Sequence, residues 1–237
     1  MFHQLFIQTG SLFLFLWHWF LQCALWKRPP PNVIIGICGK KGVGKDTSAG
    51  IIQSLMWSMH GDWYKHRAFA KPLKEVVQIL TQCPHDKLNT HEGKESVFYN
   101  PFTPKPETFR DILKAVGKAT RCYLANWIDQ RWKRDTEAAK NWRLPNLWVV
   151  SDLRLDDELK WMRAQKGEAI VFVVHVWSPY HEDGMDRDIS EVSVDAFPKN
   201  EIDFTIENNH WDDNQQNLEE QCQRVCQAIL YRVYRLS

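Results

Sequence analysis

A short apolar run that leads into a glycine-rich loop is the feature of this chain that most constrains its fold. Residues 33–38 are rich in β-branched side chains and predict a buried strand. The pattern Gly39-x-x-x-x-Gly44-Lys45 follows at once, and a stretch with helical spacing comes next. Glycines allow a tight turn whose backbone N–H groups point inward at phosphate oxygens, and the positive end of the following helix adds to this attraction. The order of strand, loop and helix therefore predicts a phosphate-binding loop; the alternative is a glycine-rich turn that binds no ligand.

The residues expected to hold ATP are contiguous in the sequence. Lys45 would reach the β and γ phosphates as a mobile ammonium group. Asp46 occupies the position at which this pattern usually has Ser or Thr for Mg²⁺, and Thr47 follows it. We therefore expect Asp46 or Thr47 to help hold the metal, directly or through water. The predicted nucleotide-binding set is Gly39, Lys40, Lys41, Gly42, Val43, Gly44, Lys45, Asp46 and Thr47.

Length and composition predict one main domain with a small insert. The chain has 237 residues, of which 44% are hydrophobic. Its formal net charge of +1 argues against a dedicated nucleic-acid-binding protein. The six cysteines include no Cys-x-x-Cys pair, so we interpret them as reduced, mostly buried thiols of an intracellular protein. We assign residues 32–237 to the main domain and about 82–143 to the insert.

Residues 1–31 form a separate hydrophobic extension with a proline linker. Residues 5–26 are mostly Leu, Phe and Trp, and Lys27, Arg28 and three prolines follow. Three interpretations stay open: a membrane or interfacial anchor, a poorly ordered or packed extension, and a start codon placed too far upstream. If the segment inserted, its positive flank would keep the rest of the chain in the cytoplasm. We therefore expect a cytoplasmic protein, with membrane contact through residues 5–26 left open.

Strand and helix patterns alternate along the rest of the chain. Predicted strands cover residues 33–38, 64–69, 147–150, 169–176 and 202–206. Predicted helices cover residues 46–60, about 72–80, much of 105–143, 157–165 and 218–233. Residues 81–106 are polar and rich in proline, so we expect a loop there with one helical turn near 91–97. This alternation predicts a three-layer α/β fold with a parallel central sheet and a ligand crevice at the carboxyl ends of its strands.

Basic residues dominate the predicted insert. Residues 105–143 contain ten Lys or Arg and five acidic residues. Such a bias suits a second anionic substrate, although a solvated helix face explains surface lysines equally well. Arg110 and Arg121 are the strongest candidates, because a guanidinium group grips phosphate through two hydrogen bonds and both lie among apolar neighbours.

Two further charged positions follow predicted strands. Asp152 follows the strand at 147–150, a position from which a carboxylate can orient hydrated Mg²⁺ or substrate. Its alternative is a helix N-cap, a role open to Asp152 or Asp156. The charged stretch 179–199 either closes over the nucleotide, with Arg187 supplying positive charge, or is an ordinary surface loop. We interpret His175, inside the strand at 169–176, as a core or strand-end histidine.

Several motifs together resemble the deoxynucleoside monophosphate kinases of bacteriophages and large DNA viruses. They are Gly42-x-Gly44-Lys45-Asp46-Thr47, the segment 69–75 (Phe-Ala-Lys-Pro-Leu-Lys-Glu), and Phe109-Arg110-Asp111-Ile112-Leu113 with Gly117 and Arg121. Ser151-Asp152-Leu153-Arg154, Ser190-Glu191 and Ile206-Glu207-Asn208 agree in order and spacing. The similarity spans about residues 33–230. One departure is Asp188, where the family often has His.

The resemblance implies a P-loop kinase fold and transfer of the ATP γ-phosphate to a deoxynucleoside monophosphate, with Mg²⁺. The resemblance also implies that Asp is tolerated in place of Ser or Thr after Lys45. As our hypothesis for the mechanism, we assign catalytic roles to Lys45, Arg110, Arg154 and Arg187. We further expect substrate binding by Lys71, Arg110, Arg121, Asp152 and Arg154, and metal binding by Asp46, Thr47 and Asp152.

Two other functions fit the same sequence. Phosphomevalonate kinase of the animal type shares the Gly-Lys-Asp loop, a Pro-Leu-Lys-Glu segment and a terminal Ile-Glu-Asn. A function of another class is that of an anchored nucleotide-binding regulator, which binds ATP without phosphorylating an acceptor.

The expected partner is a small nucleoside monophosphate, and no nucleic acid is expected. The oligomeric state is left open, with a homodimer as one alternative.

Overall fold

A five-stranded parallel sheet forms the centre of the computed structural model, which describes residues 31–60, 64–100, 105–141, 145–180, 196–209 and 215–236. Its strands are β1 (Asn32–Cys38), β2 (Tyr64–Arg67), β5 (Leu147–Leu153), β6 (Ala169–Trp177) and β7 (Phe204–Glu207). They lie in the order β2-β5-β1-β6-β7, and every neighbouring pair is parallel. The strands β1, β5 and β6 are mostly buried and rich in aliphatic residues, as expected of parallel strands that are covered on both faces.

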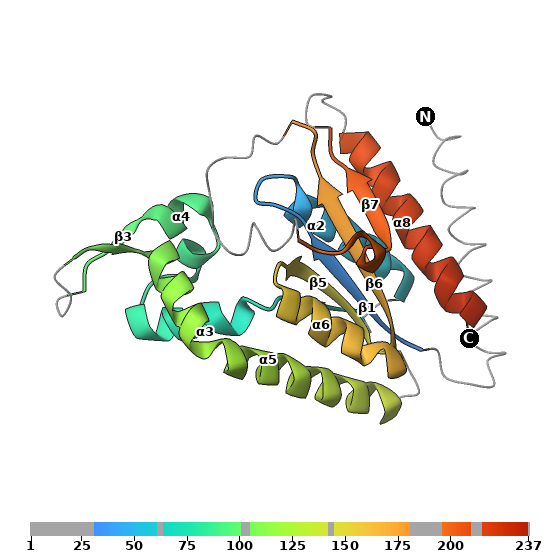
Figure 1. Cartoon of the computed structure of the whole chain (residues 1–237), viewed down its shortest axis with the longest axis horizontal. Helices are drawn as coiled ribbons and strands as arrows, with labels where there is room; N and C mark the ends of the chain where they lie inside the picture. The colour runs from blue at the N-terminus through green and yellow to red at the C-terminus, as the bar shows by residue number, and fades with distance from the viewer. Residues whose placement is uncertain are drawn as a thin grey trace.

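Helices cover both faces of this sheet (Figure 1). The helices α2 (Lys45–His60) and α8 (Gln215–Leu236) pack on the face that carries Ile35 and Ile37 of β1. The helices α5 (Phe109–Asn141) and α6 (Asp156–Ala164) pack on the face that carries Ile34 and Cys38. Successive side chains of a strand point to opposite faces, which explains how one strand serves two cores. The predicted three-layer α/β fold is therefore confirmed.

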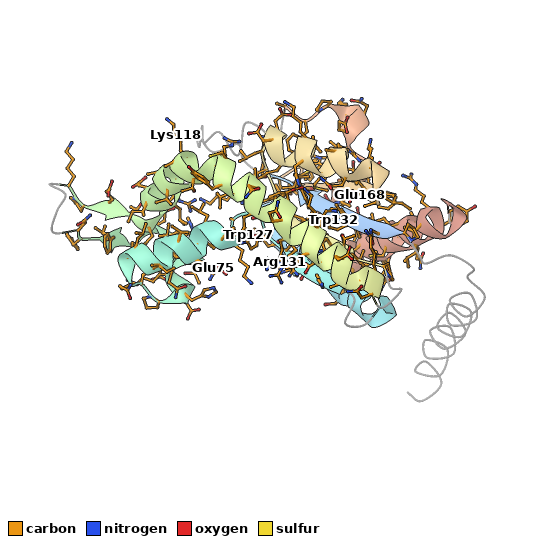
Figure 2. All side chains as sticks on the ribbon, turned by 90° about the horizontal axis from the view of Figure 1, so that it is seen from below. Glu75, Lys118, Trp127, Arg131, Trp132 and Glu168 are labelled. Carbon is orange, nitrogen blue, oxygen red and sulfur yellow. The ribbon has the colours of Figure 1, made fainter. Side chains whose placement is uncertain are left out.

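A smaller core lies beyond the edge of the sheet. It joins α3 (Lys71–Thr81), η2 (His85–Leu88), α4 (His91–Glu95) and the two-residue strands β3 (Val97–Phe98) and β4 (Glu107–Thr108) to the first turns of α5. Its buried side chains are Val77, Cys83, Leu88 and Phe109. The helix α5 runs from this core to the sheet, where Ile128 and Trp132 are buried; Figure 2 shows Trp127, Arg131 and Trp132 along it. One continuous helix thus connects the small core to the main one.

Most predicted elements form close to their expected bounds, with some differences. The strand β5 continues to Leu153, and β7 begins at Phe204, two residues after the predicted start. The predicted loop at 81–106 contains the expected turn as α4, and also η2, β3 and β4. In α3, Val76 and Leu80 share the helical spacing of Leu73 and Val77, but their side chains are 39% and 65% exposed while Val77 is buried. The helix α3 meets α5 along a narrower stripe, where Gly117 lies against Leu73.

Some predictions fall partly or wholly outside the described residues. The hydrophobic segment 5–26 and the linker, except Pro31, lie outside them, as do Arg187 and the Ser190-Glu191 pair. Within the described ranges, no helix is long and apolar enough to cross a bilayer. The five described cysteines are free, and all except Cys122 are buried, which agrees with the prediction that most of the thiols are buried. His175 lies within β6, opposite Cys38 of β1.

Candidate active site

The glycine-rich loop connects the carboxyl end of β1 to the first residue of α2. Gly39, Gly42 and Gly44 have φ angles of +155°, +88° and +86°. A Cβ atom on Gly39 would lie 2.4 Å from the Val176 carbonyl oxygen, so only glycine fits between the loop and β6. The φ angles of Gly42 and Gly44 belong to the left-handed region that favours glycine. The sequence therefore folds into a tight loop at the N-terminus of a helix, the arrangement that binds phosphate groups.

Lys45 is the buried cation of this loop. Its side chain is only 3% exposed. The ammonium group donates a hydrogen bond to Oδ1 of Asp46 at 2.8 Å and approaches the Ser151 carbonyl oxygen at 3.4 Å. Ser151 belongs to β5, so the ammonium lies across the carboxyl ends of two neighbouring strands. A buried ammonium group in this position suits a ligand with several negative oxygens.

Asp46 presents an ionised carboxylate at the same place. Its side chain is 86% exposed. Desolvation alone would raise the pKa of Asp46, but the charge of Lys45 and its hydrogen bond outweigh this effect, so the pKa lies below its usual value. An exposed carboxylate fits Mg²⁺, which prefers oxygen ligands and retains several waters. The neighbouring Thr47 is also exposed and offers a hydroxyl oxygen.

Asp152 holds the loop between β2 and α3. Its two carboxylate oxygens accept hydrogen bonds from the backbone N–H groups of Phe69 and Ala70, at 2.7 Å and 2.8 Å. It does not cap α6, because that helix begins at Asp156 and has Leu155 at its N-cap position. The N-cap alternative is therefore wrong for both aspartates. Asp152 instead joins β5 to the start of the segment 69–75, which is one of the motifs described in the sequence.

Cations from four separate segments lie close enough together for the charges of three of them to act on the fourth, Lys94. They are Lys74 of α3, Lys94 of α4, Arg110 of α5 and Arg154 after β5. Burial lowers the pKa of Lys94 to about 8, and the charges of the other three cations contribute to this shift. Burial also lowers the pKa of Lys74, although the carboxylates of Asp152 and Asp46 oppose the change. We call these four residues the cation cluster.

The cation cluster contains two predicted residues and two that sequence reasoning missed. Arg110 and Arg154 are among the substrate-binding residues that the sequence predicts. Lys74 lies inside the segment 69–75, and that motif was the signal that could have identified it. Lys94 lies in the helical turn predicted near 91–97 within a polar stretch, and no local pattern distinguishes it from other surface lysines. Its position becomes informative only when α4 packs against α5.

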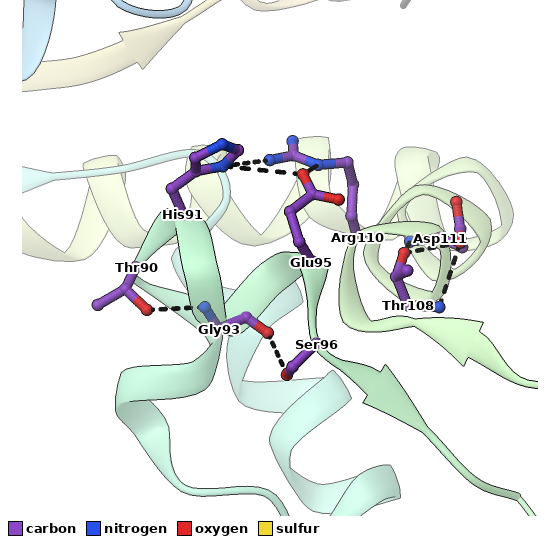
Figure 3. Close-up of polar contacts among 8 residues, drawn as sticks. All are labelled: Thr90, His91, Gly93, Glu95, Ser96, Thr108, Arg110 and Asp111. Carbon is purple, nitrogen blue, oxygen red and sulfur yellow. Dashed lines mark hydrogen bonds and ion pairs between the residues drawn. The ribbon is translucent and has the colours of Figure 1, made fainter.

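Arg110 is oriented by neighbours in the small core (Figure 3). Its Nε lies 2.5 Å from Oε1 of Glu95, and one terminal nitrogen lies 3.4 Å from Nδ1 of His91. The hydrogen bond from Arg110 lowers the pKa of Glu95, which keeps that carboxylate charged. The first turn of α5 is fixed by Thr108, whose hydroxyl donates to Oδ2 of Asp111 at 2.6 Å. The guanidinium group is thus held by both its helix and its ion pair.

The remaining predicted residues lie around this centre. Arg121 forms an ion pair with Asp157, with Nε 3.1 Å from Oδ2, and so lies at the start of α6. The Arg154 backbone N–H donates to Oε2 of Glu158 at 2.8 Å. Lys71 is exposed at the first residue of α3. In the described ranges, no group of three or more His, Cys, Asp or Glu side chains could hold a metal ion.

Comparisons with known proteins identify neither a family nor a substrate for this chain. No protein-family model matches the chain, and no curated protein matches it significantly. Solved structures that match include a gluconokinase from Sinorhizobium meliloti 1021, at 13% identity and a TM-score of 0.33, over 87% of this chain and 99% of that chain. A similarity this weak supports no argument about fold or activity. The parallel sheet and the glycine loop between β1 and α2 are themselves consistent with a P-loop kinase fold.

Proposed function

We propose that the protein transfers the γ-phosphoryl group of ATP to a small phosphorylated acceptor, and that the acceptor is a deoxynucleoside monophosphate. The observation that carries this proposal is the position of the cation cluster. The charges of Arg154 and Lys94 help to lower the pKa of Asp46 in the glycine loop, and the charges of Asp46 and Arg154 act on both Lys74 and Lys94. Two anion-binding regions thus lie together, as transfer between two phosphates requires.

The glycine loop is the proposed ATP site. Backbone N–H groups of residues 39–45 and the Lys45 ammonium would bind the β and γ phosphates. Asp46 and Thr47 would hold Mg²⁺, with Asp152 acting through water, and the metal would supply positive charge to the same phosphates. Phosphoryl transfer depends mainly on positioning and on neutralising negative charge, so these groups need no covalent role.

The cation cluster is the proposed acceptor site. Arg110 and Arg154 would bind the acceptor phosphate through paired hydrogen bonds, and Lys74 and Lys94 would add point charges. Arg121 and Lys71 would contact the rest of the acceptor. Arg187 would add charge to the moving phosphoryl group. The insert at about 82–143 then serves acceptor binding, since Lys94 and Arg110 both come from it.

The choice of acceptor rests on the sequence. Phe69-Ala70 and the stretch from Arg110 to Arg121 resemble nucleotide kinases more than phosphomevalonate kinase. Both acceptor classes carry a phosphate that the cation cluster could hold, so substrate turnover must separate them.

An ADP-release assay on the full chain tests this proposal. The acceptors are dTMP, dGMP, dCMP, dAMP and mevalonate phosphate, each with Mg·ATP, beside a reaction without acceptor. We expect ADP release that depends on at least one deoxynucleotide. ADP release only with mevalonate phosphate would show that mevalonate phosphate, and not a deoxynucleotide, is the acceptor. Tight ATP binding without release in any reaction would indicate a regulator and would contradict transfer.

A further inference from the structure

We propose that Asn208 is a positioning residue that fixes one peptide group of the glycine loop, and that Gln221 of α8 supports Asn208 in this role. The inference rests on the proposed function, because it assigns the loop to a nucleotide. It concerns residues that lie after the last strand and in the last helix, more than 160 positions away from the loop in the sequence.

The Asn208 side chain reaches directly into the loop. Its Nδ2 donates a hydrogen bond to the Val43 carbonyl oxygen at 3.0 Å. Only 8% of the residue is exposed, so this amide is shielded from competing water. The Asn208 backbone N–H also donates to the Trp177 carbonyl oxygen at 2.8 Å, which fixes the residue at the end of β6. A buried donor held at both ends can impose an orientation on the group that it binds.

The anchored carbonyl determines where the next N–H group points. In a planar trans peptide, the oxygen of Val43 and the N–H of Gly44 lie on opposite sides of the bond. Binding of the Val43 oxygen to Asn208 therefore directs the Gly44 N–H away from Asn208. Glycine tolerates many backbone conformations, and Gly44 has a φ of +86°. The peptide between Val43 and Gly44 would thus flip easily without an anchor.

The space around Gly44 fits this role. A Cβ atom at Gly44 would lie 2.2 Å from Nδ2 of Asn208, so the amide occupies the volume that any larger side chain would need. The Gly44 carbonyl oxygen also accepts the Ser48 N–H at 2.9 Å, in the first turn of α2. Both peptide groups that flank Gly44 are therefore held, one by Asn208 and one by the helix.

Gln221 holds the strand residue that precedes Asn208. Its Oε1 accepts the Glu207 N–H at 2.9 Å, and its Nε2 donates to the Glu207 carbonyl oxygen at 2.7 Å. The strand β7 is at the edge of the sheet and has β6 as its neighbour, so the side-chain amide takes the place of a further strand. The next residue, Cys222, directs its Sγ to the Ser48 carbonyl oxygen at 3.9 Å. The helix α8 thus contacts both β7 and α2.

Loss of the anchor has a specific consequence. A flipped peptide would replace one N–H donor of the loop with a carbonyl oxygen, and this oxygen would repel phosphate. Binding of a nucleotide at the loop would weaken, while binding of the acceptor at the cation cluster would not change. A general loss of stability would weaken the binding of both ligands together. The loss of nucleotide binding relative to the loss of acceptor binding therefore identifies a positioning role.

Calorimetric titration of the full chain tests the inference. The chain is titrated with Mg·ADP and, in a separate experiment, with dTMP or the acceptor that the ADP-release assay identifies. The variants are Asn208→Ala, Gln221→Ala and, as a matched control on the same helix, Gln223→Ala. We expect about tenfold weaker Mg·ADP binding for Asn208→Ala, equal to the loss of one buried hydrogen bond, with unchanged acceptor binding. We expect roughly two- to fivefold weaker Mg·ADP binding for Gln221→Ala and no change for Gln223→Ala.

Three results would overturn the inference. The first is Mg·ADP binding by Asn208→Ala within twofold of wild type, when wild type itself binds. The second is an equal loss for both ligands in Asn208→Ala. If thermal melting shows that Asn208→Ala does not fold, Gln221→Ala alone decides the test. The third result is then Mg·ADP binding by Gln221→Ala that equals that of wild type. If wild type itself binds no Mg·ADP, the proposed function fails. Failure of this inference alone is therefore distinguished by Mg·ADP binding in wild type.

Discussion

The ammonium group of Lys45 lies 2.8 Å from the carboxylate of Asp46, its neighbour in the sequence. The two side chains differ greatly in exposure, at 3% for Lys45 and 86% for Asp46. The buried cation therefore faces the ligand region with a solvated anion beside it. This pairing suits a site that must bind both a polyphosphate and its metal ion, since each charge has a separate partner in the proposed complex.

Asp46→Asn tests the metal role of this carboxylate. The amide keeps the shape of the side chain and removes its charge, so Mg²⁺ should bind more weakly. We expect the Mg²⁺ concentration that gives half-maximal ADP release to rise roughly tenfold or more. Asp46→Ser restores a hydroxyl that this loop pattern usually has and should show a smaller rise. An unchanged Mg²⁺ dependence in Asp46→Asn would remove Asp46 from the metal site.

Glu95→Gln tests whether the ion pair orients Arg110. The pair is at the surface, so it should contribute little to stability, and the melting temperature should stay close to that of wild type. The KM for the acceptor should rise several-fold, while the KM for ATP stays the same. Arg110→Ala should raise the acceptor KM by roughly 10- to 100-fold, because it removes a charge-assisted hydrogen-bond donor. The matched control is Glu137→Gln, whose carboxylate lies 3.6 Å from Lys140 on the same helix. Equal effects of Arg110→Ala on both substrates would refute the assignment.

Lys94 predicts a pH dependence of acceptor binding. Because its pKa is lowered to about 8, the ammonium loses its proton as the pH rises through that value. The acceptor phosphate is already a dianion there, since its second pKa is about 6. The kcat/KM for the acceptor should therefore fall as pH increases from about 7 to 9. Lys94→Arg keeps the charge and should flatten this profile, while Lys94→Met should lower kcat/KM at all pH values. If kcat/KM for the acceptor falls equally with pH in Lys94→Arg, the group that titrates is not Lys94.

Glu158 predicts a pH dependence of stability. Burial raises the pKa of this carboxyl to about 8, and the charge of Asp152 contributes to the shift. The folded state thus holds a proton that the unfolded state has already released above about pH 5. Stability from this group is full below its unfolded pKa and is lost as the pH rises through the folded pKa. The free energy of unfolding should fall by about 2 to 4 kcal/mol between about pH 5 and pH 8.

Glu158→Gln is the control for that measurement. The amide oxygen can still accept the backbone N–H groups of Arg154 and Leu155, which Oε2 of Glu158 accepts at 2.8 Å and 3.0 Å. Denaturant unfolding should show a smaller dependence on pH in the variant. Parallel curves for wild type and variant would contradict the raised pKa.

Local patterns predict the layers of this fold well. The apolar run 169–176 forms the strand β6, which lies beside the central strand β1, and the spacing of Leu218, Cys222 and Val225 matches the buried side of α8. Periodicity could not show which side of α3 has a partner. Val76 and Leu80 share its apolar spacing, yet they remain exposed because α5 meets α3 near Leu73 and Gly117.

Contacts between distant segments explain what the sequence could not show about the site. The loop motif identifies Lys45, because all its determinants are adjacent in the chain. Lys94 has no neighbouring pattern, and only the packing of α4 brings it to Arg110 and Lys74. Asn208 was recognised as part of a motif, but its hydrogen bond to Val43 depends on β7 lying beside β6.

The rate of acceptor-dependent ADP release by Lys45→Ala, compared with wild type, tests the central claim most directly. That claim is that the glycine loop and its buried ammonium hold ATP for transfer of the γ-phosphoryl group. The variant should remain folded, as judged by its circular dichroism, and its kcat should fall by roughly 10²- to 10³-fold or more. A folded variant that turns over at nearly the wild-type rate would contradict it.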